Sequence, residues 1–285
     1  MTLEGEAWPA PAKLNLMLRV LGRRENGYHD LQTVFQFIKH QDELHFEPRD
    51  DGQIRLLTPT PGVPAEKDLC YRAARTLQQS TGTPLGADIR LVKRLPMGGG
   101  LGGGSSDAAT TLVALNHLWQ TSLDERQLQI LGLQLGADVP IFVHGHASWA
   151  EGVGEHFDPI DPPCPWYLVL APDCHVSTAE IFAQPDLTRQ SPRIKIRDFL
   201  GGDCRNDCLP VVRRRHPQVA AALDWLNQFA EPRLTGTGAC VFAAFDEQQQ
   251  ALDALQARPA DLEGFVTRGL NRSPLLDRLQ RDGFQ

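Results

Sequence analysis

Apolar and polar residues alternate between residues 12 and 20, where the chain reads AKLNLMLRV. A period of two is typical of a β-strand that buries one face and exposes the other. One face would carry Leu14, Leu16, Leu18 and Val20, and the other Lys13, Asn15, Met17 and Arg19. An Asn26-Gly27 turn and a second apolar run over residues 31–38 follow, so we expect an antiparallel partner strand.

Several further elements are predicted from the same patterns. Strands are expected over residues 43–47, 53–57 and 87–92, with a helix over 68–79 between the last two. Apolar residues recur at helical spacing from Ala108 to Trp119, so a helix should begin directly after the glycine-rich stretch that precedes them. Ser105 or Ser106 would cap that helix.

A second helix is expected to begin at a capping box over residues 122–125 and to end at Gly136. Pro140 follows, and a proline disfavours helical geometry at the residue before it. We therefore expect a strand over residues 141–143. Asp138 would lie at a fixed junction between the helix and this strand.

Four prolines fall within residues 158–165, a composition typical of a connection between domains. We therefore divide the chain of 285 residues into residues 1–157 and 158–285. The second part should contain a buried strand at 166–172, a helix near 218–229 and a small-residue turn that leads into a strand within 233–245.

Composition and charge narrow the class of partner. Apolar residues make up 41% and charged residues 22%, the net charge is -7, and no sustained lysine or arginine block occurs. These values indicate a globular protein with a small-molecule partner and argue against a nucleic-acid or membrane surface. No apolar run approaches about 18 residues and the first residues include two acids, so we expect a cytoplasmic protein. The six cysteines lack metal or disulfide spacing and are expected to be free thiols.

The most informative stretch is LPMGGGLGGGSSDAAT, residues 95–110. Glycines let backbone N–H groups surround an anion and the start of a helix adds unpaired donors, so we expect a polyphosphate site. A Walker A loop is excluded because Ser105 stands where its lysine is required. Gly98, Gly100 and Gly103 fit a dinucleotide fingerprint, but in a run this rich in glycine the match carries little weight.

The stretch PMGGGLGGGSSDAA resembles the ATP-binding loop of the GHMP kinases, and PAKLNLMLRV and LTGTGACVF resemble that family's first and third motifs. The resemblance implies an α+β, two-domain GHMP kinase fold: an N-terminal nucleotide-binding domain with a mixed sheet and helices, and a C-terminal α+β sandwich domain. It also implies ATP with Mg²⁺ as cofactor. The residues that it assigns to ATP are Pro96, Met97, Gly98, Gly99, Gly100, Leu101, Gly102, Gly103, Gly104, Ser105 and Ser106.

The resemblance assigns Lys13 and Asp138 to catalysis. In the resembling kinases the matching aspartate accepts the proton of the substrate hydroxyl, and the matching lysine holds that aspartate ionised. Phosphoryl transfer needs charge neutralisation and an aligned hydroxyl, which such a pair can provide. From the residues alone, Lys13 is equally well explained as a solvated lysine, and Asp138 as a turn-forming residue beside glycine and proline.

Two further blocks, ENGYHDLQTVFQ and GADVPIFVHGHASWAEGVGE, are similar to family members that phosphorylate a tertiary hydroxyl of the cytidine diphosphate form of methylerythritol, in the non-mevalonate route to isoprenoid precursors. The residues that this resemblance assigns to the acceptor are Asn15, Tyr28, His29, Thr178, Phe182, Gly236 and Thr237. Tyr28 would stack on the cytosine. The competing explanations are an ordinary half-buried aromatic for Tyr28 and a structural tight turn for Gly236-Thr237.

The chain departs from the family pattern where we expect Asn-Leu beside the adenine pocket, because it has Asp68-Leu69, so we assign no adenine contact to Asp68. Magnesium ligands are not assigned: Ser105, Ser106 or Asp107 could reach the ion, but Asp107 is equally explained as a first-turn acid favoured by the helix dipole. The alternatives are a homoserine or mevalonate type of kinase from the same family, or a nucleotide-binding regulatory module without turnover. We expect a monomer or a weak homodimer.

Overall fold

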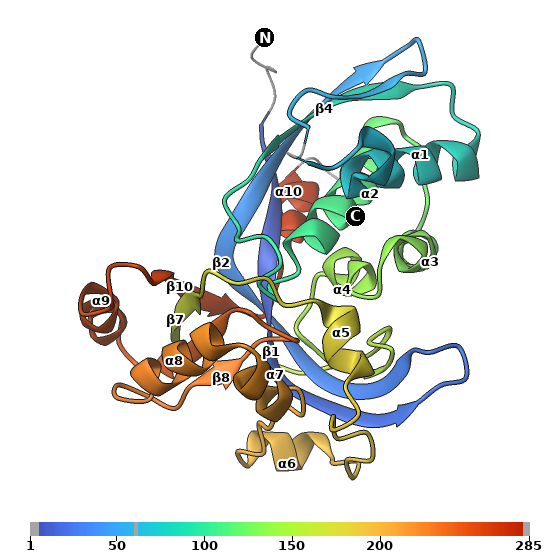
Figure 1. Ribbon diagram of the computed structural model, residues 1–285. Helices are drawn as coiled ribbons and strands as arrows, with labels where there is room; N and C mark the ends of the chain where they lie inside the picture. The colour runs from blue at the N-terminus through green and yellow to red at the C-terminus, as the bar shows by residue number, and fades with distance from the viewer. Residues whose placement is uncertain (1–5, 60–61, 282–285) are drawn as a thin grey trace.

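The computed structural model describes residues 6–59 and 62–281. Within these ranges the strands form one ten-stranded sheet with helices packed along it (Figure 1). The strands are β1 (Trp8–Arg23), β2 (His29–Arg49), β3 (Ile54–Leu56), β4 (Gly86–Val92), β5 (Ser148–Gly152), β6 (His156–Pro159), β7 (Trp166–Ala171), β8 (Arg233–Leu234), β9 (Val241–Phe245) and β10 (Glu263–Leu270).

The helices are η1 (Ala65–Lys67), α1 (Leu69–Thr81), α2 (Gly103–Leu118), α3 (Glu125–Leu135), α4 (Val139–His144), α5 (Thr178–Ala183), α6 (Ile196–Leu200), α7 (Leu209–Arg215), α8 (Pro217–Leu226), α9 (Gln248–Gln256) and α10 (Pro274–Arg281). The helices predicted over residues 68–79 and 218–229 are confirmed as α1 and α8, and the strands over 87–92 and 166–172 as β4 and β7. None of the helices in the described ranges is long and apolar enough to cross a membrane.

The sheet joins the early and late parts of the chain. Its main path runs β3-β4-β2-β10-β7-β9-β8, while β1 and β5 also pair with β2, and β6 pairs with β5. All pairs are antiparallel except β3 with β4. β10 pairs with β7 over residues 263–268 and with β2 at Gly269 and Leu270. This one strand therefore connects the first strands with the last ones.

A long hairpin of β1 and β2 runs through the middle of the molecule (Figure 1). The two strands predicted over residues 31–38 and 43–47 are parts of the single strand β2. The prediction that β1 buries only one face is wrong, because Lys13 and Asn15 on its polar face are 2% and 4% exposed. Helices α2 and α10 pack on β1, and a register shift between Asn15 and Met17 interrupts the alternation of its side chains.

Helix α2 begins at Gly103, immediately after the glycine loop, with Gly102 as its N-cap residue. Ser105 and Ser106 lie inside the first turn, so the prediction that one of them caps the helix is wrong. Gly102 has a φ of 74°, a left-handed conformation that glycine adopts without strain, and this lets the helix begin before the serines. Because Gly102 has no side chain, the first N–H groups of α2 are left for another partner.

Two other predictions about helix boundaries are corrected. Residues 141–143 belong to α4 and not to a strand, because Pro140 lies in the first turn, where its missing N–H removes no hydrogen bond. The N-cap of α3 is Asp124 and not Ser122, and Asp124 forms a reciprocal capping box with the residue three positions later. Asp138 therefore precedes a helix and not a strand.

Three groups of buried apolar side chains hold the elements together. The first group lies between the early strands and α1–α4, and the second lies around β7–β9, α7 and α8. The third contains Leu14 and Met17 from β1 together with Val169 from β7 and Phe242 from β9. Early and late parts of the chain thus share one core, and the domain boundary between residues 157 and 158 stays a prediction.

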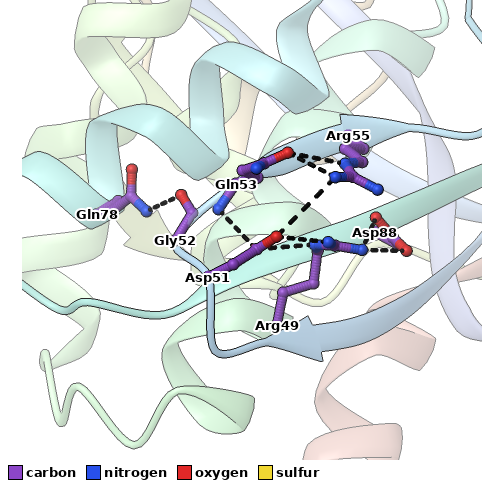
Figure 2. A network of polar contacts seen from close by, with 7 residues as sticks. All are labelled: Arg49, Asp51, Gly52, Gln53, Arg55, Gln78 and Asp88. Atoms are coloured by element: carbon purple, nitrogen blue, oxygen red, sulfur yellow. Dashed lines mark hydrogen bonds and ion pairs between the residues drawn. The ribbon is translucent and has the colours of Figure 1, made fainter.

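A network of polar contacts ties α1 to the edge of the sheet (Figure 2). Arg49 at the end of β2 donates to Asp51 in the next turn and to Asp88 on β4. Gln78 of α1 donates to Gly52 O at 2.9 Å. The hydrogen bond from Arg49 lowers the pKa of Asp51 to about 2. The position of α1 relative to β2 and β4 is therefore fixed by side chains as well as by the apolar core.

Candidate active site

Two cavities meet between the glycine loop, the β1–β2 hairpin and α5. The first, called the loop cavity, has a volume of about 590 Å³ and is lined by residues 96–105 with parts of α1, β4 and α2. The second, called the hairpin cavity, has a volume of about 600 Å³ and is lined by parts of β1, residues 26–29 and α5. Gly100, Asp138 and Thr178 line both cavities. Each cavity has the size of a small-molecule site, and the two are adjacent at these three residues.

The glycines of the loop are required by the packing of the protein itself. A Cβ at Gly99 would lie 2.5 Å from Cys240 Sγ, and a Cβ at Gly100 would lie 2.4 Å from Thr235 O. The loop therefore packs directly on residues 235–240, the second glycine motif. Burial raises the pKa of the Cys240 thiol to about 12, so this side chain is a protonated packing group at neutral pH.

Backbone hydrogen bonds hold the loop in position. Lys13 N donates to Leu101 O and Cys240 N donates to Gly99 O, both at 3.0 Å. The loop then leads into α2, whose first residues, 103–104, line the loop cavity without a side-chain cap. Unpaired N–H groups and the helix dipole favour an anion at this place, so the loop cavity fits a triphosphate.

The ammonium of Lys13 lies at the junction of the two cavities. Lys13 is 2% exposed, which excludes the explanation of a solvated surface lysine. Its Nζ donates to Asn15 Oδ1 at 2.5 Å and to Gly100 O at 3.0 Å, and lies 3.3 Å from Asp138 Oδ2. It also lies 5.5 Å from the centroid of the Phe35 ring. A buried charge is costly unless it is paired and hydrogen-bonded, and these contacts meet that requirement.

The carboxylate of Asp138 faces Lys13 and the cavities. Asp138 is the N-cap residue of α4, yet its side chain makes no hydrogen bond to that helix. A turn-forming or capping aspartate would bond to nearby backbone N–H groups. The Asp138 side chain is 38% exposed, so a ligand in either cavity can contact it. This geometry suits a group that accepts a proton from a bound hydroxyl.

Asn15 is fixed between Lys13 and the next strand. Its Oδ1 accepts from Lys13, and its Nδ2 donates to Thr33 Oγ1 at 2.8 Å. Thr33 donates in turn to Met17 O at 2.6 Å. Asn15 lines the hairpin cavity, but its amide is already hydrogen-bonded on both sides. Its clearest effect in this structure is therefore to orient the Lys13 ammonium.

Aromatic side chains form part of the wall of the hairpin cavity. Tyr28 is 58% exposed, so it is not an ordinary half-buried aromatic. The His29 ring stacks on Phe182 of α5, with ring centroids 4.9 Å apart and planes 27° apart. Burial, followed by the charges of Arg189 and Arg23, lowers the pKa of His29. The imidazole of His29 is therefore neutral at pH 7.

The second glycine motif also reaches the hairpin cavity. The hydroxyls of Thr178 on α5 and Thr237 in this motif are 2.9 Å apart. Asn206 Nδ2 donates to Leu234 O at 2.8 Å and to Gly236 O at 2.9 Å. These two hydrogen bonds fix the conformation of the turn. Asn206 lies outside every motif, and no signal in the sequence would have indicated its contribution.

Sequence reasoning also misses an ion network beside the loop cavity. Lys93 Nζ lies 2.6 Å from Asp42 Oδ2 and 2.7 Å from Asp107 Oδ2. Asp42 Oδ1 accepts the backbone N–H groups of Arg94 and Leu95, at 2.6 and 2.8 Å. The network therefore fixes the residues that lead into the glycine loop. The available signal was the basic pair Lys93-Arg94 close before the loop.

Burial and neighbouring charges shift the pKa values of the members of this network differently. Burial raises the pKa of Asp107 to about 7, with Lys93 opposing the shift and Asp42 adding to it. Burial alone would lower the pKa of Lys93, but the carboxylates of Asp107 and Asp42 outweigh it and raise that pKa. Among the described residues, Asp107 Oδ1 is buried and has no hydrogen-bond partner. Asp107 is therefore the member whose charge changes near neutral pH.

The remaining predicted residues lie at different depths. Residues 96–105 line the loop cavity, with Met97 68% exposed. Ser106 is fully buried and lines neither cavity. Asp68 lines the loop cavity, but its Oδ1 accepts the N–H of Cys70 at 2.8 Å and so caps α1. The Asp68 side chain thus has a structural role at the position where the family pattern predicted asparagine.

No group of three or more His, Cys, Asp or Glu side chains in the described part of the chain could hold a metal ion. Mg²⁺ usually keeps several waters and binds through substrate phosphates with one or two carboxylates. The loop cavity fits that pattern, because Asp107 and Ser105 line it beside the start of α2 and could each contribute an oxygen.

Comparison with known proteins gives the family. Residues 68–146 match the N-terminal domain of the GHMP kinases, and residues 191–261 match the C-terminal domain. The chain is 58% identical over 276 residues to 4-diphosphocytidyl-2-C-methyl-D-erythritol kinase of Nitrosococcus oceani, a match that covers 97% of this chain and 99% of that protein. It is 60% identical over 272 residues to the protein of the same name from Pseudomonas aeruginosa, covering 95% and 96%.

A solved structure agrees with this match. The crystal structure of a 4-(cytidine 5'-diphospho)-2C-methyl-D-erythritol kinase superimposes with a TM-score of 0.81 at 31% identity, covering 93% of this chain and 99% of that one. The α+β, two-domain fold implied by the sequence motifs is confirmed by this likeness and by the two family domains. The chain therefore belongs to the GHMP kinase family.

Proposed function

We propose that the protein transfers the γ-phosphoryl group of ATP to the 2-hydroxyl of 4-diphosphocytidyl-2-C-methyl-D-erythritol, in the non-mevalonate route to isoprenoid precursors. Relatives of 58% and 60% identity that are named for this substrate support the choice of acceptor. The observation that carries the proposal is the meeting of the two cavities at Asp138, whose carboxylate lies 3.3 Å from Lys13.

In this proposal, ATP lies in the loop cavity with its phosphates on the glycine loop, and the acceptor lies in the hairpin cavity with its hydroxyl at Asp138. The hydroxyl loses its proton to Asp138 while its oxygen bonds to the γ-phosphorus. The bond from the γ-phosphorus to the bridging oxygen breaks, and ADP leaves with that electron pair. Lys13 orients Asp138 and stabilises charge on the transferred group.

Magnesium enters the proposal as the ion that accompanies ATP and, when bound, would neutralise charge on the β- and γ-phosphates. The chain itself lines the loop cavity with Lys67 and Lys93. Lys93 is held by Asp42 and Asp107, so its ammonium is preset and does not have to be ordered when ATP binds.

The hairpin cavity supports a cytidine-bearing acceptor. Tyr28 offers an exposed ring, and stacking of a base on an aromatic ring contributes about 1–3 kcal/mol. The stacked rings of His29 and Phe182 form a second flat surface. Homoserine and mevalonate have no flat ring to use these surfaces. A regulatory module without turnover would leave the pairing of Lys13 with Asp138 unexplained.

The proposed partners are small molecules only. A net charge of -7 without a basic block supports the absence of nucleic-acid and membrane partners from the proposal. We also propose that the protein is cytoplasmic and is a monomer or a weak homodimer.

The test uses the purified protein with ATP, Mg²⁺ and one alcohol at a time, and follows ADP. We expect ADP with the cytidine diphosphate form of methylerythritol, together with a product that carries one more phosphate by mass spectrometry. If ADP formed only with homoserine or mevalonate, the proposed acceptor would be wrong, but the proposal that the protein is a kinase would stand. Binding of ATP without ADP from any alcohol would favour the regulatory module.

A further inference from the structure

Arg189 makes four hydrogen bonds that join the end of α5 to the β1–β2 hairpin. Its Nη2 donates to Phe182 O at 2.8 Å and to Gln184 O at 2.6 Å, and its Nη1 donates to Leu187 O at 3.3 Å. Its Nε donates to His29 Nε2 at 3.3 Å. One planar guanidinium therefore links the backbone of Phe182 to the side chain of His29, and these two rings are stacked on each other.

These contacts decide which nitrogen of His29 carries the proton. A neutral imidazole has one donor and one acceptor nitrogen, whereas arginine has only donors. Because Arg189 donates to Nε2, the proton of the neutral ring must be on Nδ1. Burial, together with the positive charges of Arg189 and Arg23, disfavours a second proton by lowering the pKa of His29. The remaining polar atom of the ring is therefore a donor.

We propose that Arg189 is a positioning residue for the acceptor: it fixes His29 as the Nδ1–H tautomer against Phe182, so that the hairpin cavity presents a preset N–H donor to the cytidine. This inference rests on the proposed function. The pyrimidine edge carries carbonyl and ring-nitrogen acceptors that such a donor can bond. Without Arg189, the imidazole would exchange tautomers and rotate, and acceptor binding would include the cost of ordering it.

The shape of the guanidinium explains why arginine stands at this position. Its donors diverge in one fixed plane and can reach several acceptors at once, whereas a lysine ammonium is a compact point charge on a flexible stem. Arg189 lines neither cavity, so it acts through His29 and Phe182 and not by touching a ligand. A change at Arg189 should therefore affect binding of the acceptor and leave ATP binding and the chemical step nearly unchanged.

The kinetic test compares Arg189→Met and Arg189→Lys with the unchanged protein. For Arg189→Met we expect the KM of the cytidine-bearing acceptor to rise about tenfold, equivalent to about 1.4 kcal/mol, with kcat and the KM of ATP within about twofold. Arg189→Lys should recover only part of this loss. Arg197→Met is the control, because Arg197 on α6 has a side chain that is 78% exposed, and it should leave all three constants unchanged.

A second measurement is made on the unchanged protein and does not depend on how the Arg189 variants fold. Nitrogen-15 NMR of the imidazoles in the unchanged protein reports the tautomer of each of the nine histidines, and His29→Gln identifies the His29 signals by their loss. We expect the Nδ1–H form for His29 at pH 7.5. An Nε2–H form, or a mixture of tautomers in fast exchange, would overturn the inference even if the arginine variants were unstable.

The outcomes separate this inference from the proposed function. An unchanged protein that does not phosphorylate the cytidine-bearing acceptor would remove the proposed function and this inference together. An active protein in which Arg189→Met leaves the acceptor KM unchanged would remove the role of Arg189 alone. A fall in kcat and in ATP affinity along with acceptor affinity would show a general structural role, which also contradicts the proposal.

Discussion

At the scale of single residues, the proposed chemistry depends on one carboxylate. Asp138 is exposed to both cavities and is held by Lys13 at 3.3 Å. Asp138→Asn keeps the size and shape of the side chain but cannot accept the hydroxyl proton. We expect kcat to fall by at least about 10²-fold, the usual contribution of a general base, while the Kd of ATP changes by no more than about threefold.

The measurements for Asp138→Asn are ADP release at saturating substrates and calorimetric titration with ATP. Asp224→Asn is the matched control, because Asp224 has a side chain that is 63% exposed and pairs with Arg213 on the neighbouring helix. It should retain full turnover. Near-normal turnover of Asp138→Asn would remove this residue from the mechanism.

A second prediction concerns Asp107 and pH. Its pKa is raised from 3.8 to about 7 in the folded protein, so the folded state holds a proton that the unfolded chain loses earlier. This contribution favours folding at low pH and is lost as the pH rises towards about 7. Asp107→Asn can still accept from Lys93 but does not titrate. We therefore expect the variant to gain Tm relative to the unchanged protein between about pH 5 and pH 8.

Differential scanning fluorimetry at constant ionic strength over this pH range measures the effect. The informative quantity is the difference in Tm between Asp107→Asn and the unchanged protein, because other titrating groups then cancel. A difference for Asp107→Asn that does not vary with pH would mean that Asp107 is already ionised throughout the range.

The sequence motifs predicted some residues of the site, but the residues that support them were missed for a physical reason. Lys13 and Asp138 were identified because each lies within a motif, and the structure brings them together. Asp42 and Arg189 lie in no motif, and they reach the site only because β2 and the loop after α5 fold beside it. Such supporting contacts depend on tertiary structure and leave no local pattern in the sequence.

At the scale of elements, the glycine loop is held by contact with the second glycine motif. A Cβ at Gly100 would lie 2.4 Å from Thr235 O, and the φ of Gly100 is 77°. Gly100→Ala therefore combines backbone strain with a clash against another backbone. We expect Tm and turnover both to fall, with a loss of stability above the about 1–2 kcal/mol that a left-handed alanine costs by itself.

Gly82→Ala separates the two causes. Gly82 has a φ of 68°, close to that of Gly100, but an added Cβ would meet nothing within 4 Å. This variant should lose stability through strain alone and should keep its turnover. Chemical denaturation of both variants gives the comparison, and equal losses in the two would contradict the proposed contact between the glycine motifs.

Secondary structure was easiest to predict where the sequence pattern of a segment agreed with the way that segment is buried in the fold. The helical spacing after the glycine loop predicted α2, but the prediction for residues 141–143 failed because a proline is also accepted in the first turn of a helix. The half-buried pattern of β1 was misleading for a different reason. The side chains of Lys13 and Asn15 line the hairpin cavity and are buried there, so the charge of Lys13 did not mean contact with solvent.

At the scale of the whole molecule, the shared core predicts how the protein unfolds. Leu14 and Met17 pack with Val169 and Phe242, so the early and late parts of the chain cannot separate without exposing apolar surface. We expect one cooperative thermal transition, with equal calorimetric and van't Hoff enthalpies. Scanning calorimetry tests this, and two resolved transitions would mean that the predicted domains at residues 1–157 and 158–285 unfold independently.

The arrangement of the two cavities has a consequence for the order of events during turnover. Because Gly100, Asp138 and Thr178 border both cavities, the places proposed for nucleotide and alcohol lie on different sides of Asp138. In the proposed reaction both molecules can therefore be bound at the same time. We expect the phosphoryl group to pass directly between them, without a phosphorylated side chain as an intermediate.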